Sequence, residues 1–252
     1  MSDLALTHGL TMVSRCVRLS RRTLDALIMS LVLPVMLMVL FVYLFGGAIQ
    51  TGGDYLTYVV PGVILLSVGF ASAQTAVSVA QDMHTGVIDR FRSMDIGGAA
   101  LVFGHVAASV LRNAVATVLV FGVALAIGFR PQAGPLGWLG AVGVLLAFML
   151  ALSWLSAAIG LLAGNPESAA GFTFFVAFLP YPSSAFVPID TMPSWLQGFA
   201  TNQPISPVIE TVRGLLLDRP VGNNAAIALA WCAGILVVSA IASALLFRRR
   251  TA

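Results

Sequence analysis

The sequence predicts an all-α membrane protein with six transmembrane helices. Of its 252 residues, 59% are hydrophobic and only 9% are charged, whereas soluble domains average about 25% charged residues. A helix that crosses a bilayer needs about 20 mostly apolar residues, and helices are expected because lipid leaves every backbone polar group to be paired internally. Six stretches meet this requirement: residues 26–46, 56–80, 103–129, 136–163, 168–187 and 225–247.

The placement of arginine predicts the orientation of these spans. All thirteen basic residues are Arg. With the N-terminus inside, nine of them fall in cytoplasmic segments and three in external ones, while Arg112 lies within a span. Because cytoplasmic loops carry the excess of basic residues, we expect a multi-pass protein of the cell membrane with both termini cytoplasmic. Residues 82–98 are then cytoplasmic and residues 188–224 external.

The N-terminal segment 9–25 predicts an amphipathic helix that lies on the membrane. At 100° per residue, one face carries apolar side chains and the other carries arginines. An interfacial helix rests with its basic face toward the headgroups. The alternative is the ordinary basic flank of a membrane anchor. The apolar face comprises Met12, Val13, Cys16, Val17, Ser20 and Leu24, and the opposite face comprises Arg15, Arg18, Arg21, Arg22 and Asp25.

The segment 82–98 is the only charge-dense stretch between residue 26 and the C-terminal arginines. A helix starting at Val87 would place Phe91 and Met94 on one face, with Ile88 at its edge and the charged residues pointing away. Gly86 would permit a sharp turn into that helix. Apolar side chains rimmed by charge suit a helix seated in the groove of a partner. An interfacial helix with its apolar face in lipid is the alternative.

Two polar side chains lie inside the third span. Arg112 is about 10 Å into it at a rise of 1.5 Å per residue, and Asn113 follows. An ionisable residue at such a depth is a functional candidate. The structural alternative is that Arg112 reaches back to the cytoplasmic surface or pairs with Glu167. Glu167 itself suits the first turn of the fifth span, where negative charge is favoured.

Prolines are predicted to break the outer half of the fifth span. Pro180 and Pro182 free backbone carbonyl groups, which together with Ser183 and Ser184 would line a pathway if they faced a cavity. A kink that serves packing alone is an equal alternative.

The external segment 188–224 predicts short helices in place of one long helix. Its five prolines, Pro188, Pro193, Pro204, Pro207 and Pro220, prevent a continuous helix. Pro193 suits the start of a short capping helix, and Trp195 would sit at headgroup level. Glu210 and Arg213, three residues apart, would hold the return toward the last span.

Several classes of activity are excluded or unsupported. The chain has no Lys, so it cannot contain a Walker A loop with its phosphate-binding Lys and is not itself the ATPase. It has no Gly-x-Ser-x-Gly motif. Cys16 and Cys232 stand far apart, and the three histidines have no metal-ligand spacing. We therefore expect no catalytic site, no metal and no cofactor in this chain, and no nucleic-acid partner.

Three groups of motifs together resemble the ABC-2 type exporter permeases, near the daunorubicin/doxorubicin-resistance branch. The first group is Gly86-Val87-Ile88-Asp89-Arg90-Phe91-Arg92-Ser93-Met94 with Gly104-His105. The second is Leu111-Arg112-Asn113 with Gly128-Phe129-Arg130-Pro131. The third is Ala185-Phe186-Val187-Pro188, Met192-Pro193-Ser194-Trp195-Leu196, Pro204-Ile205-Ser206-Pro207 and Val212-Arg213. The chain departs from the family at Asp95, where Pro is usual, and at His105, where Arg is frequent.

The resemblance implies a permease that works as a dimer with two ATP-binding subunits, which would carry ATP and Mg. It also implies that residues 86–95 form a coupling helix seated on the ATPase. The expected cargo is an amphipathic drug or antibiotic that is moved out of the cell. Two alternatives remain: an exporter of lipid, glycolipid or polysaccharide with the same architecture, and a membrane scaffold or biogenesis factor that transports nothing.

Overall fold

The computed structural model describes residues 24–49, 51, 53–85 and 98–251, and within them all regular structure is helical. The predicted interfacial helix 9–25 lies almost entirely outside these residues. The elements are α2 (Leu24–Leu40), the π-helical turn η1 (Phe41–Phe45), α3 (Tyr55–His84), α5 (Gly98–Ile127), α6 (Pro135–Leu162), α7 (Pro166–Phe178), the 3-10 turn η2 (Ile189–Thr191), α8 (Ser194–Asn202), α9 (Ile205–Leu216) and α10 (Asn224–Thr251).

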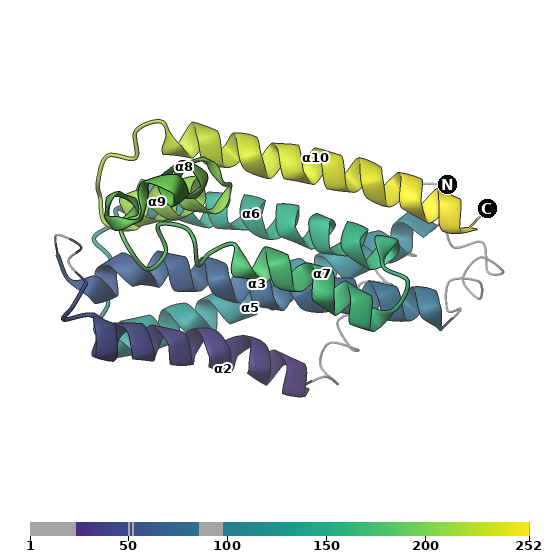
Figure 1. Ribbon diagram of the computed structural model, residues 1–252, viewed down its shortest axis with the longest axis horizontal. Coiled ribbons are helices and arrows are strands. Elements are labelled where there is room, and N and C mark those ends of the chain that lie inside the picture. Colours follow the sequence, from purple (N-terminus) through teal and green to yellow (C-terminus); the bar gives the residue numbers. More distant parts are fainter. Residues whose placement is uncertain (1–23, 50, 52, 86–97, 252) are drawn as a thin grey trace.

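The helix α3 occupies the centre of the bundle. It packs against α2, α5, α6, α7 and α9, while α10 packs on α6 and α9. The short helices α8 and α9 gather at one end of the bundle, beside the starts of α3 and α6 (Figure 1). We call this the α8–α9 end. The C-terminus of α10, the end of α3 and the start of α7 lie at the opposite end.

Four of the described helices are long and apolar enough to cross a membrane. They are Tyr55–His84, Leu101–Ile127, Pro135–Leu162 and Asn224–Arg249, while Val32–Phe45 forms a shorter apolar helix. The segment expected at 168–187 differs from a full span, because α7 ends at Phe178 and turns follow to residue 186. Proline has no backbone N–H to donate to the preceding turn of a helix, so Pro180 and Pro182 account for the early end.

Burial differs sharply among the long helices. In the most apolar part of α3, 78% of the residues are buried, against 22% in α5 and 17% in α10. The exposed faces of α5 and α10 are apolar, as Val118 and Val238 show with 69% and 67% exposure. Apolar residues on the outside of a bundle indicate contact with lipid or with another membrane chain.

Glycines allow α3 to approach its neighbours closely. A Cβ atom at Gly160 of α6 would lie 2.5 Å from the Ala76 carbonyl oxygen and 2.8 Å from Cβ of Val79. A Cβ atom at Gly62 of α3 would lie 2.6 Å from Cβ of Ala185. Small residues at helix interfaces let backbones pack closely in membranes, so these two glycines set the position of α6 and of the turn after α7.

We predict that Gly160→Ala lowers the stability of the protein by about 1–3 kcal/mol, because overpacking a tight helix contact forces the backbones apart. The measurement is the thermal unfolding midpoint of the purified full chain in detergent. The control is Gly143→Ala on the same helix, where a Cβ atom would meet nothing within 4 Å. Equal midpoints for the two variants would contradict the close contact.

Candidate functional site

The predicted coupling residues Gly86, Val87, Ile88, Asp89, Arg90, Phe91, Arg92 and Met94 lie outside the described residues. The helices that lead into and out of this segment are described. They are α3, which ends at His84, and α5, which begins at Gly98. Polar contacts between α3 and α5 therefore decide how the segment is attached to the bundle.

A row of polar side chains joins α3 to α5. Nearest to the segment, the Nε2 atom of His105 lies 3.0 Å from Oδ2 of Asp82, and both residues are buried. Deeper in the bundle, the Nδ2 group of Asn113 donates to the hydroxyl of Ser72 at 2.8 Å. Arg112 lies between these two contacts. We call this set, together with Thr75, the α3–α5 polar row.

Arg112 is fastened to the neighbouring helix. Its Nε group donates to the Ala71 carbonyl at 3.2 Å, and its Nη2 group donates to the Thr75 hydroxyl at 2.7 Å. This geometry favours the structural interpretation of Arg112 over a free charge in a pathway. Glu167 lies exposed in the first turn of α7, where the Asn165 side chain caps the helix by accepting from Ser168 N at 2.8 Å.

The pair between Asp82 and His105 was missed by the sequence analysis. Asp82 and His105 are 23 residues apart. The alignment of α3 against α5, which brings the two side chains together, cannot be predicted from the segment between them. The only sequence signal was that each residue is polar beside an apolar span. The row continues to α6, where the Ser153 hydroxyl donates to that of Ser109 at 2.9 Å.

The turns after α7 are closed by their own polar groups. The Ser183 hydroxyl donates to the Pro180 carbonyl and accepts from Ala185 N, and Ser184 N donates to the Ser206 hydroxyl. The Gln203 side chain donates to the Pro182 carbonyl at 2.7 Å. The predicted break at Pro180 is confirmed, and the carbonyl groups of Pro180 and Pro182 are bonded within the protein. Gln203 carried no signal in the sequence.

Six aromatic rings form a continuous row from α7 to the end of α2. Successive centroids are 6.1 Å apart for Phe174 and Phe178, 4.9 Å for Phe178 and Tyr181, and 5.5 Å for Tyr181 and Phe186. The row continues with 4.5 Å between Phe186 and Phe41 and 5.4 Å between Phe41 and Phe45. We call these six residues the aromatic row.

The two ends of the aromatic row are open. Phe174 and Phe178 on α7 and Phe45 after α2 are exposed, while Phe186 in the middle is buried. Offset stacking and edge contacts between rings favour such spacings. The described part of the chain therefore presents exposed aromatic side chains at both ends of the row, on two elements that are far apart in sequence.

A short helix, α8, lies where the external cap was predicted. Residue Pro193 immediately precedes α8, and Pro188 immediately precedes the turn η2. Trp195 is 79% exposed on α8 and Phe199 is 50% exposed. Both side chains are thus available to a membrane interface at the α8–α9 end.

Arg213 is buried and joins three elements. Its Nε and Nη2 groups donate to the Tyr58 carbonyl at 3.1 and 2.9 Å, and Nη2 also donates to the Ser184 carbonyl at 2.7 Å. Its guanidinium carbon lies 3.8 Å from the centroid of the Tyr58 ring. The expected pair with Glu210 is confirmed, three residues apart on α9. Tyr58, which contributes most of these contacts, was not singled out by the sequence.

We predict that Arg213→Lys and Arg213→Ala each lower the stability of the protein, the Ala variant by on the order of 3 kcal/mol, because buried acceptors lose their partner. Lys does not substitute, since it lacks the planar fork that reaches several acceptors at once. The measurement is the unfolding midpoint in lipid-free detergent. Arg219→Gln, at an exposed arginine of the same end, serves as the control, and a wild-type midpoint for Arg213→Lys would contradict the joining role.

Comparison with known proteins places these features in a family. Residues 7–217 match the ABC-2 type transporter family. A daunorubicin resistance ABC transporter permease protein of Streptomyces coeruleorubidus is 33% identical over 228 residues, covering 90% of this chain and 81% of that protein. A probable doxorubicin resistance permease protein of Mycobacterium tuberculosis is 26% identical over 222 residues, covering 87% and 80% respectively.

A second doxorubicin resistance permease protein of Mycobacterium tuberculosis is 27% identical over 209 residues, which cover 77% of this chain and 69% of that protein. The family match extends from the N-terminal segment through α9 and so includes the α3–α5 polar row, the aromatic row and Arg213. The resemblance noted from the motifs is thereby confirmed. The chain belongs to the ABC-2 type transporter family and is a multi-pass membrane permease related to antibiotic-resistance exporters.

Proposed function

We propose that this chain is the permease subunit of an ATP-driven exporter that moves planar, amphipathic compounds out of the cell. The observation that carries this proposal is the aromatic row, with exposed rings at both of its ends. A planar ligand gains about 0.5–1.5 kcal/mol from each favourable aromatic contact beyond the burial of its area. The relatives are named for resistance to daunorubicin and doxorubicin, which supports this class of cargo over polysaccharide.

The energy source in this proposal is a separate ATPase subunit that binds ATP and Mg. Residues Gly86 to Met94, with Phe91 as the main apolar side chain, would form the helix that contacts it. The α3–α5 polar row supports this arrangement, because it joins the two helices that flank the segment. A movement of the segment would then be transmitted to both helices together.

A second permease chain, identical or related, completes the proposed complex. The helices α5, α7 and α10 have exposed apolar side chains, and part of this surface would pack against the second chain. Alternating access needs two discrete arrangements of packed elements, and an interface between two copies provides them.

We further propose six membrane spans with both termini cytoplasmic and the α8–α9 end outside. Irregular backbone at membrane depth is tolerated only where it is buried in protein or lines water. The turns after α7 meet this condition, since the residues from 183 to 186 are buried, and the backbone N–H and carbonyl groups of Ser184 are both bonded within the protein. α7 with these turns would thus count as the fifth span.

We predict that single cysteines introduced as Trp195→Cys and Asn202→Cys, in a background without Cys16 and Cys232, react with an impermeant thiol reagent added outside intact cells. Both side chains are exposed at the α8–α9 end. The residue at 195 should react more slowly, because it would sit at headgroup level. Labelling at 195 from the cytoplasmic side alone would overturn the orientation.

We predict that Phe178→Leu weakens export of a planar aromatic dye, raising its half-saturating concentration about two- to tenfold through the loss of one aromatic contact. The measurement is ATP-dependent uptake of ethidium into inverted membrane vesicles that contain the full chain and its ATPase. Membrane abundance and association with the ATPase are measured in the same vesicles and should be unchanged.

The matched control is Phe172→Leu, because Phe172 is also exposed on α7 and is not part of the aromatic row. Equal half-saturating concentrations for the two variants would remove the aromatic row from the pathway. ATP hydrolysis without dye uptake, or uptake of only a lipid or polysaccharide probe, would favour the alternative cargoes. A complex that neither hydrolyses ATP nor moves any probe would favour a scaffold.

A further inference from the structure

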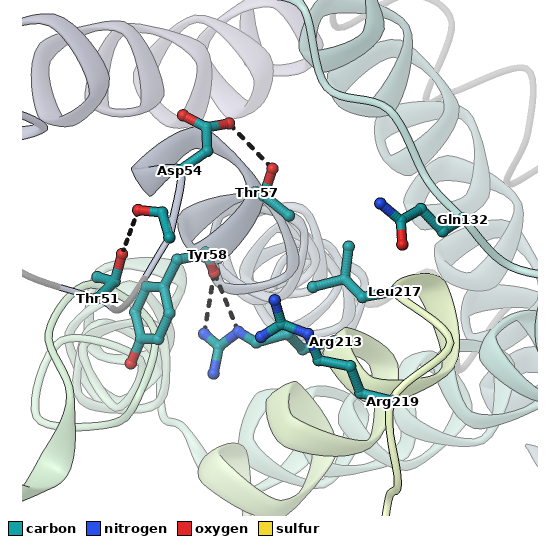
Figure 2. A pocket seen from close by; sticks show the side chains of 9 residues that line it. Thr51, Asp54, Thr57, Tyr58, Gln132, Arg213, Leu217 and Arg219 are labelled. Atoms are coloured by element: carbon teal, nitrogen blue, oxygen red, sulfur yellow. Dashed lines mark hydrogen bonds between the residues drawn. The ribbon is translucent and has the colours of Figure 1, made fainter.

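A polar hollow of about 220 Å³ opens at the α8–α9 end (Figure 2). It lies where the start of α3 meets the end of α9 and the loop before α6. If α3 and α6 cross the bilayer, their first residues stand at headgroup depth, and the hollow stands there with them. The lining residues are Thr51, Gly53, Asp54, Thr57, Tyr58, Gln132, Arg213, Leu217 and Arg219.

One side of the hollow is cationic. In the view of Figure 2, the guanidinium of Arg219 extends toward that of Arg213. Arg213 is held in place by Tyr58 and Ser184 and is paired with the Glu210 carboxylate, whereas Arg219 is exposed and its side chain has no hydrogen bond or ion pair with any residue that the structure describes. Glu210 offsets the charge of Arg213, so Arg219 is the arginine of the hollow that has no ion-pair partner among the described residues. A bound phosphate would supply that partner through charge-assisted hydrogen bonds.

The other side of the hollow is anionic and hydroxylated. The Thr57 hydroxyl donates to Oδ2 of Asp54 at 3.0 Å, and both side chains appear across the hollow from the arginines in Figure 2. Asp54 is exposed, so it keeps a carboxylate oxygen accessible. A carboxylate in this place disfavours a purely anionic ligand and favours a group that carries a positive charge beside its phosphate.

The backbone around the hollow is well anchored. Gln132 N donates to the Leu216 carbonyl at 2.9 Å, which fixes the loop before α6 to the end of α9. Arg219 N donates to the Gly214 carbonyl at 2.8 Å, which fixes the turn that carries Arg219. The arginine side of the hollow is thus fixed by backbone contacts, and Arg213 joins it to the first turn of α3 through the Tyr58 carbonyl. A binding site needs such supporting contacts.

We propose that this hollow binds the phosphoethanolamine headgroup of a membrane phospholipid, with its phosphate toward Arg219 and Arg213 and its ammonium toward Asp54. A primary ammonium offers three hydrogen-bond donors, whereas a choline group offers none, so phosphatidylethanolamine is bound in preference to phosphatidylcholine. That the phospholipid belongs to the outer leaflet rests on the proposed orientation, with the α8–α9 end outside. The headgroup chemistry does not depend on the cargo or on transport.

The test measures lipid binding to the purified full chain in detergent by native mass spectrometry. Phosphatidylethanolamine, phosphatidylcholine and phosphatidylglycerol of identical acyl chains are titrated separately. The wild-type protein is expected to bind phosphatidylethanolamine about tenfold more tightly than either of the others. Equal binding of the three lipids, or tightest binding of phosphatidylglycerol, would overturn the proposal.

Two variants separate the charged sides. Asp54→Asn is expected to reduce phosphatidylethanolamine binding to the level of phosphatidylcholine, while Arg219→Gln is expected to weaken both lipids about tenfold. The matched controls are Asp190→Asn and Arg130→Gln, exposed charges of the same end outside the hollow, and both should bind as the wild type does. Wild-type binding by Asp54→Asn and Arg219→Gln would place the lipid elsewhere.

A soluble competitor distinguishes the two sources of the headgroup. Glycerophosphoethanolamine, which lacks acyl chains, is expected to displace the lipid only at concentrations at least a hundredfold higher. Displacement at equal concentrations would identify a free zwitterion as the ligand and would contradict the lipid assignment. No ATP or ATPase is present in this test. Lipid binding can therefore be absent while dye export succeeds, and lipid binding can be present while dye export fails.

Discussion

The guanidinium of Arg213 organises the α8–α9 end of this protein. It reaches the first turn of α3 through the Tyr58 carbonyl and the turns after α7 through the Ser184 carbonyl, from a buried position on α9. The turns that it holds carry Tyr181 and Phe186, the central members of the aromatic row. The same side chain also lines the polar hollow. The guanidinium of Arg213 thus supports both the aromatic row and the polar hollow. The ammonium group of a Lys at this position would hold these regions less firmly, because it lacks the planar fork of donors.

The constraint behind this arrangement is that backbone polar groups at membrane depth need partners within the protein. Prolines end α7 after 13 residues, and the chain then turns back without regular structure. The side chains of Arg213 and Gln203 donate hydrogen bonds to carbonyl groups of that stretch, and the Ser206 hydroxyl accepts one from its backbone. The packing of α9 and the residues before it against these turns therefore stabilises the broken helix.

At the opposite end, the attachment of the segment 82–98 depends on contacts between α3 and α5. The buried pair of Asp82 and His105 stands at the start of the segment, and Arg112 and Asn113 continue the connection toward the centre of the bundle. Polar contacts between helices in a membrane are individually modest, about 0.6–2 kcal/mol. Several along one helix pair nevertheless fix its register, since a slip by one turn would leave all of them unmade.

The sequence by itself determined the helical class, the family and most helix boundaries, because hydropathy and proline placement act locally. It also predicted the break at Pro180 and the pair of Glu210 with Arg213, whose partners lie within one turn of a helix. It did not identify Tyr58, Gln203, the pair of Asp82 and His105, or the aromatic row. The polar contacts join residues that are 21 to 155 positions apart. The two halves of the aromatic row meet only where Phe41 stacks on Phe186. Only the packing of α2, α7 and α9 around α3 decided which of many polar and aromatic residues would meet, since sequence periodicity gives the face of a helix but not the neighbour or the register against which that face packs.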